Sequence, residues 1–169
     1  MGGGALLYAE VTVTMCVFVD QHWQKLLIIA VILSAFLTYG NSLNNDFVAW
    51  DDRKQIIENE IVHGLSFENF TAAFTSFDPE LYIPLTRISF QINYTLTGLD
   101  PFWFHAMNLV LHMVNTLLVA WFVYLLARKR WIAVITSILF LLHPINTEVV
   151  AWASARKDVL AATFALAAI

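Results

Sequence analysis

Long apolar stretches, separated by shorter polar ones, dominate the hydrophobic pattern of this sequence. The first uninterrupted stretch covers residues 26–43, and the second covers residues 104–127. Eighteen helical residues rise about 27 Å, which is close to the ~30 Å hydrocarbon core of a bilayer. A third stretch lies in residues 131–147, and a fourth begins in residues 156–169. The pattern predicts an all-α polytopic membrane protein.

The third stretch is short for a membrane span. Only twelve residues, from Trp131 to Leu142, precede the polar groups, and they amount to about 18 Å of helix. His143 and Glu148 therefore start below the membrane surface and line a cavity, or the helix tilts and they are interfacial. The first interpretation is favoured, because ionisable groups at that depth usually serve a site.

The polar segment 44–103 is too hydrophilic to span a membrane. Within it, residues 53–63 and 66–77 carry apolar side chains at helical spacing, and Ser66 and Asn69 are candidate helix caps. Short amphipathic helices of this kind lie flat in the headgroup region. We therefore expect juxtamembrane helices in a long first outer loop.

The two ends of the chain are less regular. Residues 1–25 alternate loosely, are interrupted by Glu10, and lack the basic start of a signal peptide. An amphipathic segment and a start-codon artefact both stay open for them. The chain stops inside the fourth apolar stretch, so we expect it to be the N-terminal fragment of a longer protein.

Composition and charge support a membrane protein and orient it. Hydrophobic residues make up 59% of the chain and charged residues only 13%. In a typical soluble domain about half of the residues are apolar and about a quarter are charged. Residues 44–100 carry nine acids against three bases, which argues against a nucleic-acid surface. The basic turn 128–130 is expected to face the cytoplasm. The segment 44–103 and the loop 148–155 then share the extracytoplasmic side.

Two adjacent carboxylates, Asp51 and Asp52, are the first candidates for chemistry. A carboxylate near a membrane surface can act as a general base toward a hydroxyl, or hold a divalent cation. The alternative is that both acids only favour the start of a helix through its dipole. On the motif alone, that alternative has the advantage.

Basic residues at the start of the fourth stretch suggest an anion site. Arg156 and Lys157 lie at the outer end of a predicted span, where a helix start already attracts phosphate. Arg87 could join them. The competing interpretation is that these side chains reach the interface and pair with Asp158.

A polar stripe runs along the second stretch. His105, Asn108, His112 and Asn115 recur at intervals of three and four residues, which places them on one helix face. Interhelical hydrogen bonding is the favoured role for the last three, while His105 could line the site. No Cys or His spacing indicates zinc, and the single Cys16 offers no disulfide.

These residues favour an enzyme that acts on a lipid-linked phosphate. A transporter is the second possibility, because broken helices and polar groups near the membrane midplane serve transporters equally well. A non-catalytic membrane anchor is the third.

Several stretches in order resemble one known family. They are FVAWDDRKQIIENEIVHGLSFENFTAAFTS, YIPLTRISF, GLDPFWFHAMNLVLHMVN and LLHPINTEVVAWASARKDVLAA. From about residue 26 to its end, the chain is similar to the membrane O-mannosyltransferases that carry C-terminal tetratricopeptide repeats, and to their bacterial relatives, within the GT-C glycosyltransferases.

The resemblance implies a GT-C-like helix bundle with its catalytic acids in the first outer loop, at Asp51 and Asp52. It implies transfer of a sugar, mannose in this family, from a polyprenyl-phosphate donor to a hydroxyl of Ser or Thr, with inversion. Arg156 and Lys157 would meet the donor phosphate together with Arg87. Glu148 and Asp158 would line the site, beside His143 and His105, which the pattern of polar residues already suggests.

The same resemblance places the active face in the bacterial periplasm or the endoplasmic reticulum lumen. The lipid-linked donor, a protein or other hydroxyl acceptor and the bilayer are the expected partners. No cofactor is required, because phosphate is already a competent leaving group. The carboxylate pair could still hold a divalent metal, and that alternative stays open. Asn substitutions of both aspartates are expected to fold normally and abolish transfer.

Overall fold

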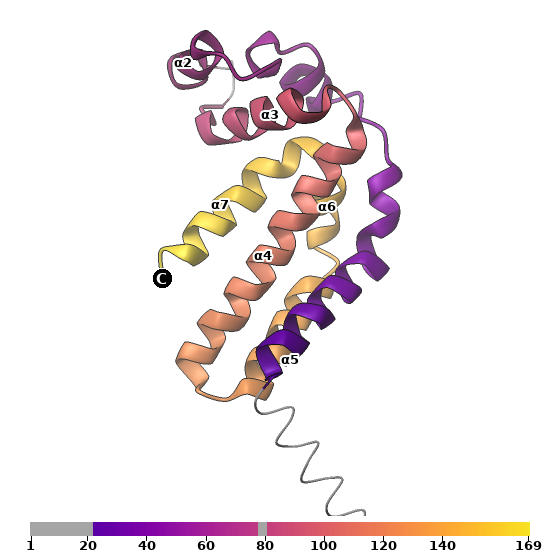
Figure 1. The fold of residues 1–169 in the computed structure, drawn as a ribbon, viewed down its shortest axis with the longest axis vertical. Coiled ribbons are helices and arrows are strands. Elements are labelled where there is room, and N and C mark those ends of the chain that lie inside the picture. The colour runs from indigo at the N-terminus through magenta and orange to yellow at the C-terminus, as the bar shows by residue number, and fades with distance from the viewer. Residues whose placement is uncertain (1–21, 78–80) are drawn as a thin grey trace, which may run out of the picture.

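The computed structural model describes residues 22–77 and 81–169 of the 169-residue chain, and these are helical with no strand. The all-α class is therefore confirmed. Most of the uncertain N-terminal segment 1–25 lies outside the described residues. The elements follow one another as a bundle of long helices capped at one end by shorter ones (Figure 1).

Among the described residues, two helices are long and apolar enough to cross a membrane, His22–Asn44 and α4 (Pro101–Ala127). The last turn of the first, Gly40–Asn44, is a 3-10 turn (η1). A shorter apolar helix, α5 (Arg130–Leu142), packs along α4. These helices and the apolar composition fit a membrane protein.

Helix α4 begins three residues before the predicted stretch 104–127, because capping residues fix its start. The side chain of Asp100 accepts a hydrogen bond from the Phe102 backbone N–H at 3.1 Å, and Pro101 occupies the first turn. The helix ends at Arg128, which adopts a left-handed conformation with φ of 53°. That residue reverses the chain, so α4 and α5 form a tight antiparallel pair.

The third apolar stretch is one helix followed by a break. Helix α5 stops at Leu142, and Pro144 lies in the turn before the short α6 (Asn146–Ala151). Proline has no N–H to continue the ladder, and it restricts the residue before it. A 3-10 turn, η4 (Ala153–Ala155), then leads into α7 (Arg156–Ala167).

The first polar segment is more irregular than its apolar spacing indicates. Residues Arg53–Ile57 form a π-type turn (η2) and Glu60–Val62 a 3-10 turn (η3), where one helix over 53–63 was expected. Helix α2 (Phe67–Thr75) is present as predicted, and the Ser66 hydroxyl caps it by accepting from Asn69 N–H at 3.0 Å. The Asn69 side chain does not cap this helix but donates to the Gly64 carbonyl oxygen at 3.0 Å.

Helix α3 (Pro84–Thr97) was not predicted. Its buried face is largely polar: it includes Thr86, Arg87, Gln91 and Asn93. Hydrophobic periodicity therefore does not mark this helix, even though Pro84 at its start and Gly98 at its end are typical boundary residues. Gly98 has φ of 65°, a conformation that glycine adopts without strain.

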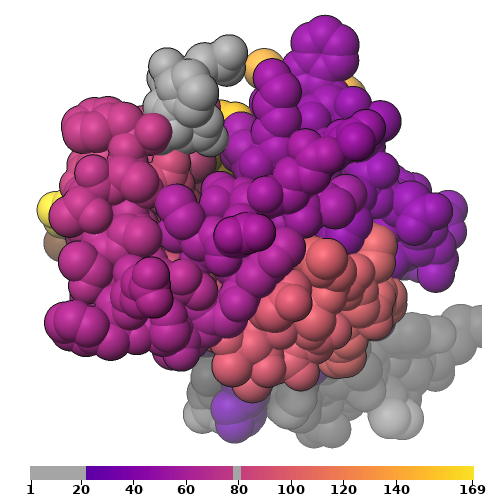
Figure 2. Space-filling model, turned by 90° about the horizontal axis from the view of Figure 1, so that it is seen from above, coloured from indigo at the N-terminus to yellow at the C-terminus, as the bar shows by residue number. Residues whose placement is uncertain are grey.

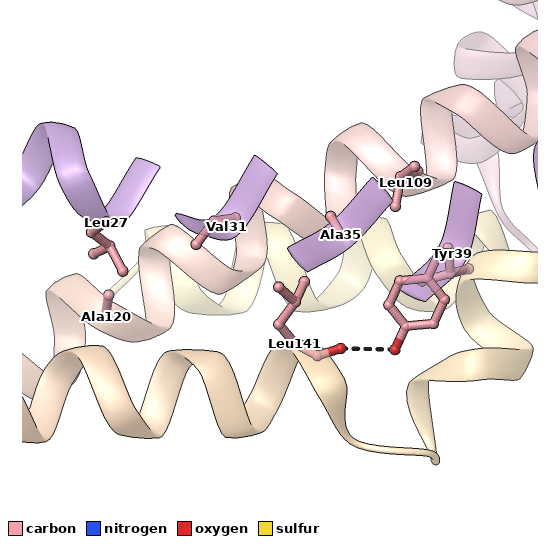
Figure 3. Packing of buried hydrophobic residues seen from close by; sticks show 8 residues of the cluster. Leu27, Val31, Ala35, Tyr39, Leu109, Ala120 and Leu141 are labelled. Atoms are coloured by element: carbon pink, nitrogen blue, oxygen red, sulfur yellow. Dashed lines mark hydrogen bonds between the residues drawn. The ribbon is translucent and has the colours of Figure 1, made fainter. Parts of the chain in front are cut away.

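The main core lies between the first helix, α4 and α5. Leu27, Val31, Ala35 and Tyr39 recur along one face of the first helix and are buried against its neighbours (Figure 3). The Tyr39 hydroxyl donates to the Leu141 carbonyl oxygen at 2.7 Å. This bond attaches the first helix to the end of α5, next to the break.

Candidate functional site

One end of the bundle gathers the polar elements. The segment 44–77, helix α3 and the starts of α4 and α7 meet there, at the top of Figure 1. Figure 2 views the molecule from this side and shows the segment 44–77 spread over that end. The two loops expected to share one side of the molecule are thus brought together, while their side of the membrane stays a prediction.

Asp52 is completely buried where these loops meet. One carboxylate oxygen accepts a hydrogen bond from the Val48 backbone N–H at 2.9 Å. The other accepts from the Ser154 backbone N–H at 2.8 Å and from the Ser154 hydroxyl. Hydrogen bonds to an ionised acceptor are stronger than neutral ones. Asp52 therefore joins two distant loops, and its oxygens are engaged by protein donors.

Asp51 has a different environment. It lines an open groove of about 330 Å³ together with Trp50, Lys54 and the pair Arg53 and Glu58. The Arg53 guanidinium donates to a Glu58 oxygen at 2.6 Å. Among the residues that the structure describes, the Asp51 carboxylate has no hydrogen-bond or ion-pair partner. Of the two adjacent acids, Asp51 is the one available to a ligand.

A second cavity of about 260 Å³ adjoins this groove, because Lys54 and Glu58 line both. Arg87 lines the second cavity and is only 3% exposed. Its guanidinium donates to the carbonyl oxygen of Ser76 at 2.7 Å and to the Ser76 hydroxyl at 3.0 Å. Neither Lys54 nor Arg87 forms an ion pair with a described residue. Two cations that form no ion pair with a described acid therefore line the space next to Asp51, together with Glu58.

Arg156 lies in the interior, away from any described cavity. It is fully buried and donates to the Asn108 side-chain oxygen at 2.9 Å and to the Phe104 carbonyl oxygen at 2.8 Å. Its guanidinium also lies 4.6 Å from the ring centre of Phe90. In this arrangement the side chain holds α3, α4 and α7 together.

Lys157 and Asp158, which follow Arg156, are directed elsewhere. Lys157 lines a separate cavity of about 220 Å³ between the start of α3 and α7, and its ammonium lies 5.9 Å from the Trp152 ring centre. Asp158 is exposed. Neither residue lines the groove of Asp51. The predicted cluster of three cations is thus divided among three places in the structure.

The three remaining predicted site residues also differ in position. His143 and Glu148 are exposed, and the His143 ring nitrogen Nδ1 lies 3.2 Å from the Ile145 backbone N–H. His105 is fully buried, within electrostatic range of Asp52 and Arg156. Neither ring nitrogen of His105 meets strict hydrogen-bond geometry with a described residue, although the backbone of Asn45 and Asp46 lies close to the ring.

The rest of the polar stripe of α4 bonds to neighbouring helices. The Asn108 amide donates to the Trp152 carbonyl oxygen at 2.9 Å, and the Asn115 amide donates to the Val159 carbonyl oxygen at 3.0 Å. A ring nitrogen of His112 lies 3.4 Å from the Leu141 carbonyl oxygen. The predicted interhelical role of these three side chains is confirmed.

Three residues of this end were missed by sequence reasoning: Ser154, Trp50 and Lys54. Ser154 sits in a small-residue turn with no local signal for its bond to Asp52. Trp50 is 74% exposed beside Asp51, and an exposed aromatic next to a candidate acid could have been noticed. Among residues 22–77 and 81–169, no group of three or more His, Cys, Asp or Glu side chains is arranged to hold a metal ion.

Comparison with known proteins decides the family. Protein O-mannosyl-transferase TMTC1 of Homo sapiens is 38% identical over 135 residues, which cover 74% of this chain and 15% of that protein. Protein O-mannosyl-transferase TMTC3 of Mus musculus is 32% identical over 157 residues, which cover 88% of this chain and 17% of that protein. The chain belongs to the protein O-mannosyl-transferase family.

The match extends to an insect relative of the same family. Protein O-mannosyl-transferase Tmtc1 of Drosophila melanogaster is 36% identical over 136 residues, 73% of this chain and 15% of that protein. The chain thus spans about one sixth of the length of these curated relatives. No protein-family model matches the chain, and no solved structure matches it.

Proposed function

We propose that this chain contributes the acceptor-activating part of a membrane glycosyltransferase. The whole protein transfers a mannosyl group from a polyprenyl-phosphate donor to a hydroxyl acceptor, a Ser or Thr side chain of a protein. Two observations support the proposal. The relatives are named protein O-mannosyl-transferases, and the Asp51 carboxylate, which no described residue pairs with, lines an open groove beside cations.

Asp51 acts as the general base. It removes the proton of the acceptor hydroxyl while the hydroxyl oxygen attacks the anomeric carbon of the sugar. The bond between that carbon and the phosphate oxygen breaks, and the polyprenyl phosphate leaves with the electron pair. One displacement of this kind inverts the anomeric configuration. The proton ends on Asp51 and returns to solvent.

Lys54 and Arg87 offset the charge that develops on the leaving phosphate. Both line the cavity that adjoins the Asp51 groove, and neither is paired with a described acid. Arg87 is buried and held by Ser76, and cations aimed at the place where charge develops stabilise a transition state. Arg87 thus stays in the expected phosphate-binding set. Lys54 takes the place of Arg156, whose guanidinium is occupied inside the bundle.

Asp52 is a positioning residue in this proposal. Its bonds to Val48 and Ser154 hold the backbone on both sides of Asp51 against the 153–155 turn. The exposed Trp50 ring supplies an apolar face beside the base, against which the apolar side of a sugar ring can pack. The bundle is a part of a GT-C-like, multi-pass membrane domain, with this end extracytoplasmic.

The test is transfer by the purified full-length protein in detergent. Polyprenyl-phosphate mannose and a Ser- and Thr-containing acceptor peptide are supplied, and the mannosylated peptide is measured by mass spectrometry. Asp51→Asn is expected to lower the rate by about 100-fold or more, the range for loss of a general base. A protein that binds the donor but releases it unchanged would instead be a transporter. Full activity of Asp51→Asn would overturn the assignment of the base.

A further inference from the structure

The opposite end of the bundle carries an apolar groove between the first helix and α4. Its volume is about 290 Å³. Trp23, Leu27 and Ile28 line one wall, and Trp121 and Tyr124 line the other. The Trp23 and Tyr124 rings are 5.3 Å apart, and Trp121 is 48% exposed. Aromatic side chains of this type are enriched where a protein meets the membrane interface.

Positive charge is concentrated beside this groove. Arg128 lies one helical turn beyond Tyr124, and its backbone N–H donates to the Tyr124 carbonyl oxygen at 2.9 Å. Arg128 and Lys129 are exposed. The Arg130 guanidinium lies 5.9 Å from the Trp23 ring centre, which places this third cation over the groove wall. No described acidic residue belongs to the turn or lines the groove.

The distribution of acids strengthens the contrast between the two ends. The nine described acids lie in residues 46–68 and at Asp100, Glu148 and Asp158, all in or beside the polar elements of the other end. The first turn of α5 begins at the basic turn and has no side-chain cap, so its backbone N–H groups add to the positive potential there. An anionic group is therefore attracted to one edge of an apolar, aromatic-walled groove.

We propose that this groove binds one anionic phospholipid. Its phosphate lies beside Arg128 and Lys129, and its acyl chain lies along the groove against Leu27 and Trp121. Basic pockets between membrane helices bind anionic headgroups in this way, and the apolar walls add the burial of hydrocarbon. The site is separate from the groove of Asp51 and does not depend on the transferase activity.

Lipid binding to the purified full-length protein tests the proposal. Native mass spectrometry in detergent compares dioleoyl phosphatidylglycerol with dioleoyl phosphatidylcholine, which has the same chains and no net charge. Phosphatidylglycerol is expected to bind more tightly. Each basic residue near a headgroup contributes about fivefold in affinity, so Lys129→Gln should weaken binding about fivefold and Arg128→Gln/Lys129→Gln about 25-fold.

Two further variants separate the site from general effects. Lys25→Gln removes the same charge from an exposed residue of the same end that does not line the groove, and it should change phosphatidylglycerol binding less than twofold. Gln24→Trp places a bulky ring in the groove from an exposed position and should weaken binding of both lipids at unchanged melting temperature.

Three outcomes would overturn the proposal. Equal affinity of the wild type for the two lipids would show that the basic turn does not recognise the anionic headgroup. Equal losses in Lys129→Gln and Lys25→Gln would reduce the effect to general surface charge. A Gln24→Trp variant that keeps full lipid binding but loses thermal stability would indicate that another helix of the protein, and not a lipid, occupies the groove.

Discussion

Asp52 and Ser154 lie 102 residues apart in the sequence, and one carboxylate oxygen of Asp52 accepts hydrogen bonds from both the backbone N–H and the hydroxyl of Ser154. This contact ties the first polar segment to the turn before α7. It also explains how adjacent acids take different roles, since Asp52 is engaged on both oxygens while Asp51 lines an open groove.

The first prediction concerns the Asp52–Ser154 contact. Asp52→Asn keeps the shape but places an amide donor where the carboxylate accepts three hydrogen bonds. We expect the free energy of unfolding to fall by about 1–3 kcal/mol, the usual cost of an unmatched buried polar group. Thermal unfolding of the full-length protein in detergent measures it, with Asp51→Asn as the isosteric control that leaves the melting temperature unchanged.

The coupling between the two residues can be isolated. Ser154→Ala removes the hydroxyl bond alone, so its cost in Asp52→Asn should be smaller than in the wild type. Strictly additive losses in the double variant would show that the two side chains do not act together. The expectation that both Asn variants fold normally is accordingly revised for Asp52 and kept for Asp51.

The second prediction concerns Arg156. Arg156→Met keeps much of the apolar stem but leaves the Asn108 oxygen and the Phe104 carbonyl without their donor. The free energy of unfolding should fall by about 2–4 kcal/mol, because several buried acceptors lose hydrogen bonds to a charged group. Lys157→Met is the matched control on the next, partly exposed residue. An Arg156→Met protein of normal stability and strongly raised donor KM would restore the phosphate-binding role.

The third prediction concerns Tyr39 and Leu141. Tyr39→Phe removes the hydroxyl that donates to the buried Leu141 carbonyl at 2.7 Å, and we expect a loss of about 1 kcal/mol. Tyr82→Phe is the paired comparison, since the exposed Tyr82 hydroxyl donates to the Phe74 carbonyl oxygen at 3.1 Å. Melting temperatures of the two variants should differ, with Tyr39→Phe the lower. Equal melting temperatures of the two variants would show that the buried hydrogen bond of Tyr39 contributes no more to stability than the exposed one of Tyr82.

The fourth prediction concerns the cations next to Asp51. Lys54→Gln should lower kcat/KM for mannosyl transfer by about 10-fold or more while the fold is unchanged, because an exposed side chain is removed from a site of developing charge. Arg53→Gln serves as the control of equal charge change, since Arg53 is already paired with Glu58. Equal losses in the two variants would indicate a general electrostatic effect.

Much of the helical framework could be predicted from the sequence. The apolar stretches 26–43 and 104–127 lie within long helices, Ser66 caps α2, and the spacing of Asn108, His112 and Asn115 placed them on one bonding face. Helix α3 was missed, because its inward face is polar and the hydrophobic period disappears. Proline and glycine at its boundaries were the remaining local signal.

The sequence by itself determined the helical class, the apolar stretches, the polar stripe and the concentration of acids in one segment, because each of these depends on neighbours within a few turns. Only the tertiary structure decided which aspartate is buried, that Arg156 points into the bundle, and that Lys54 and Arg87 line adjoining cavities. The physical reason is that the hydrogen-bond partners and burial of a polar side chain are set by segments that packing brings together, such as those of Asp52 and Ser154, which are 102 residues apart.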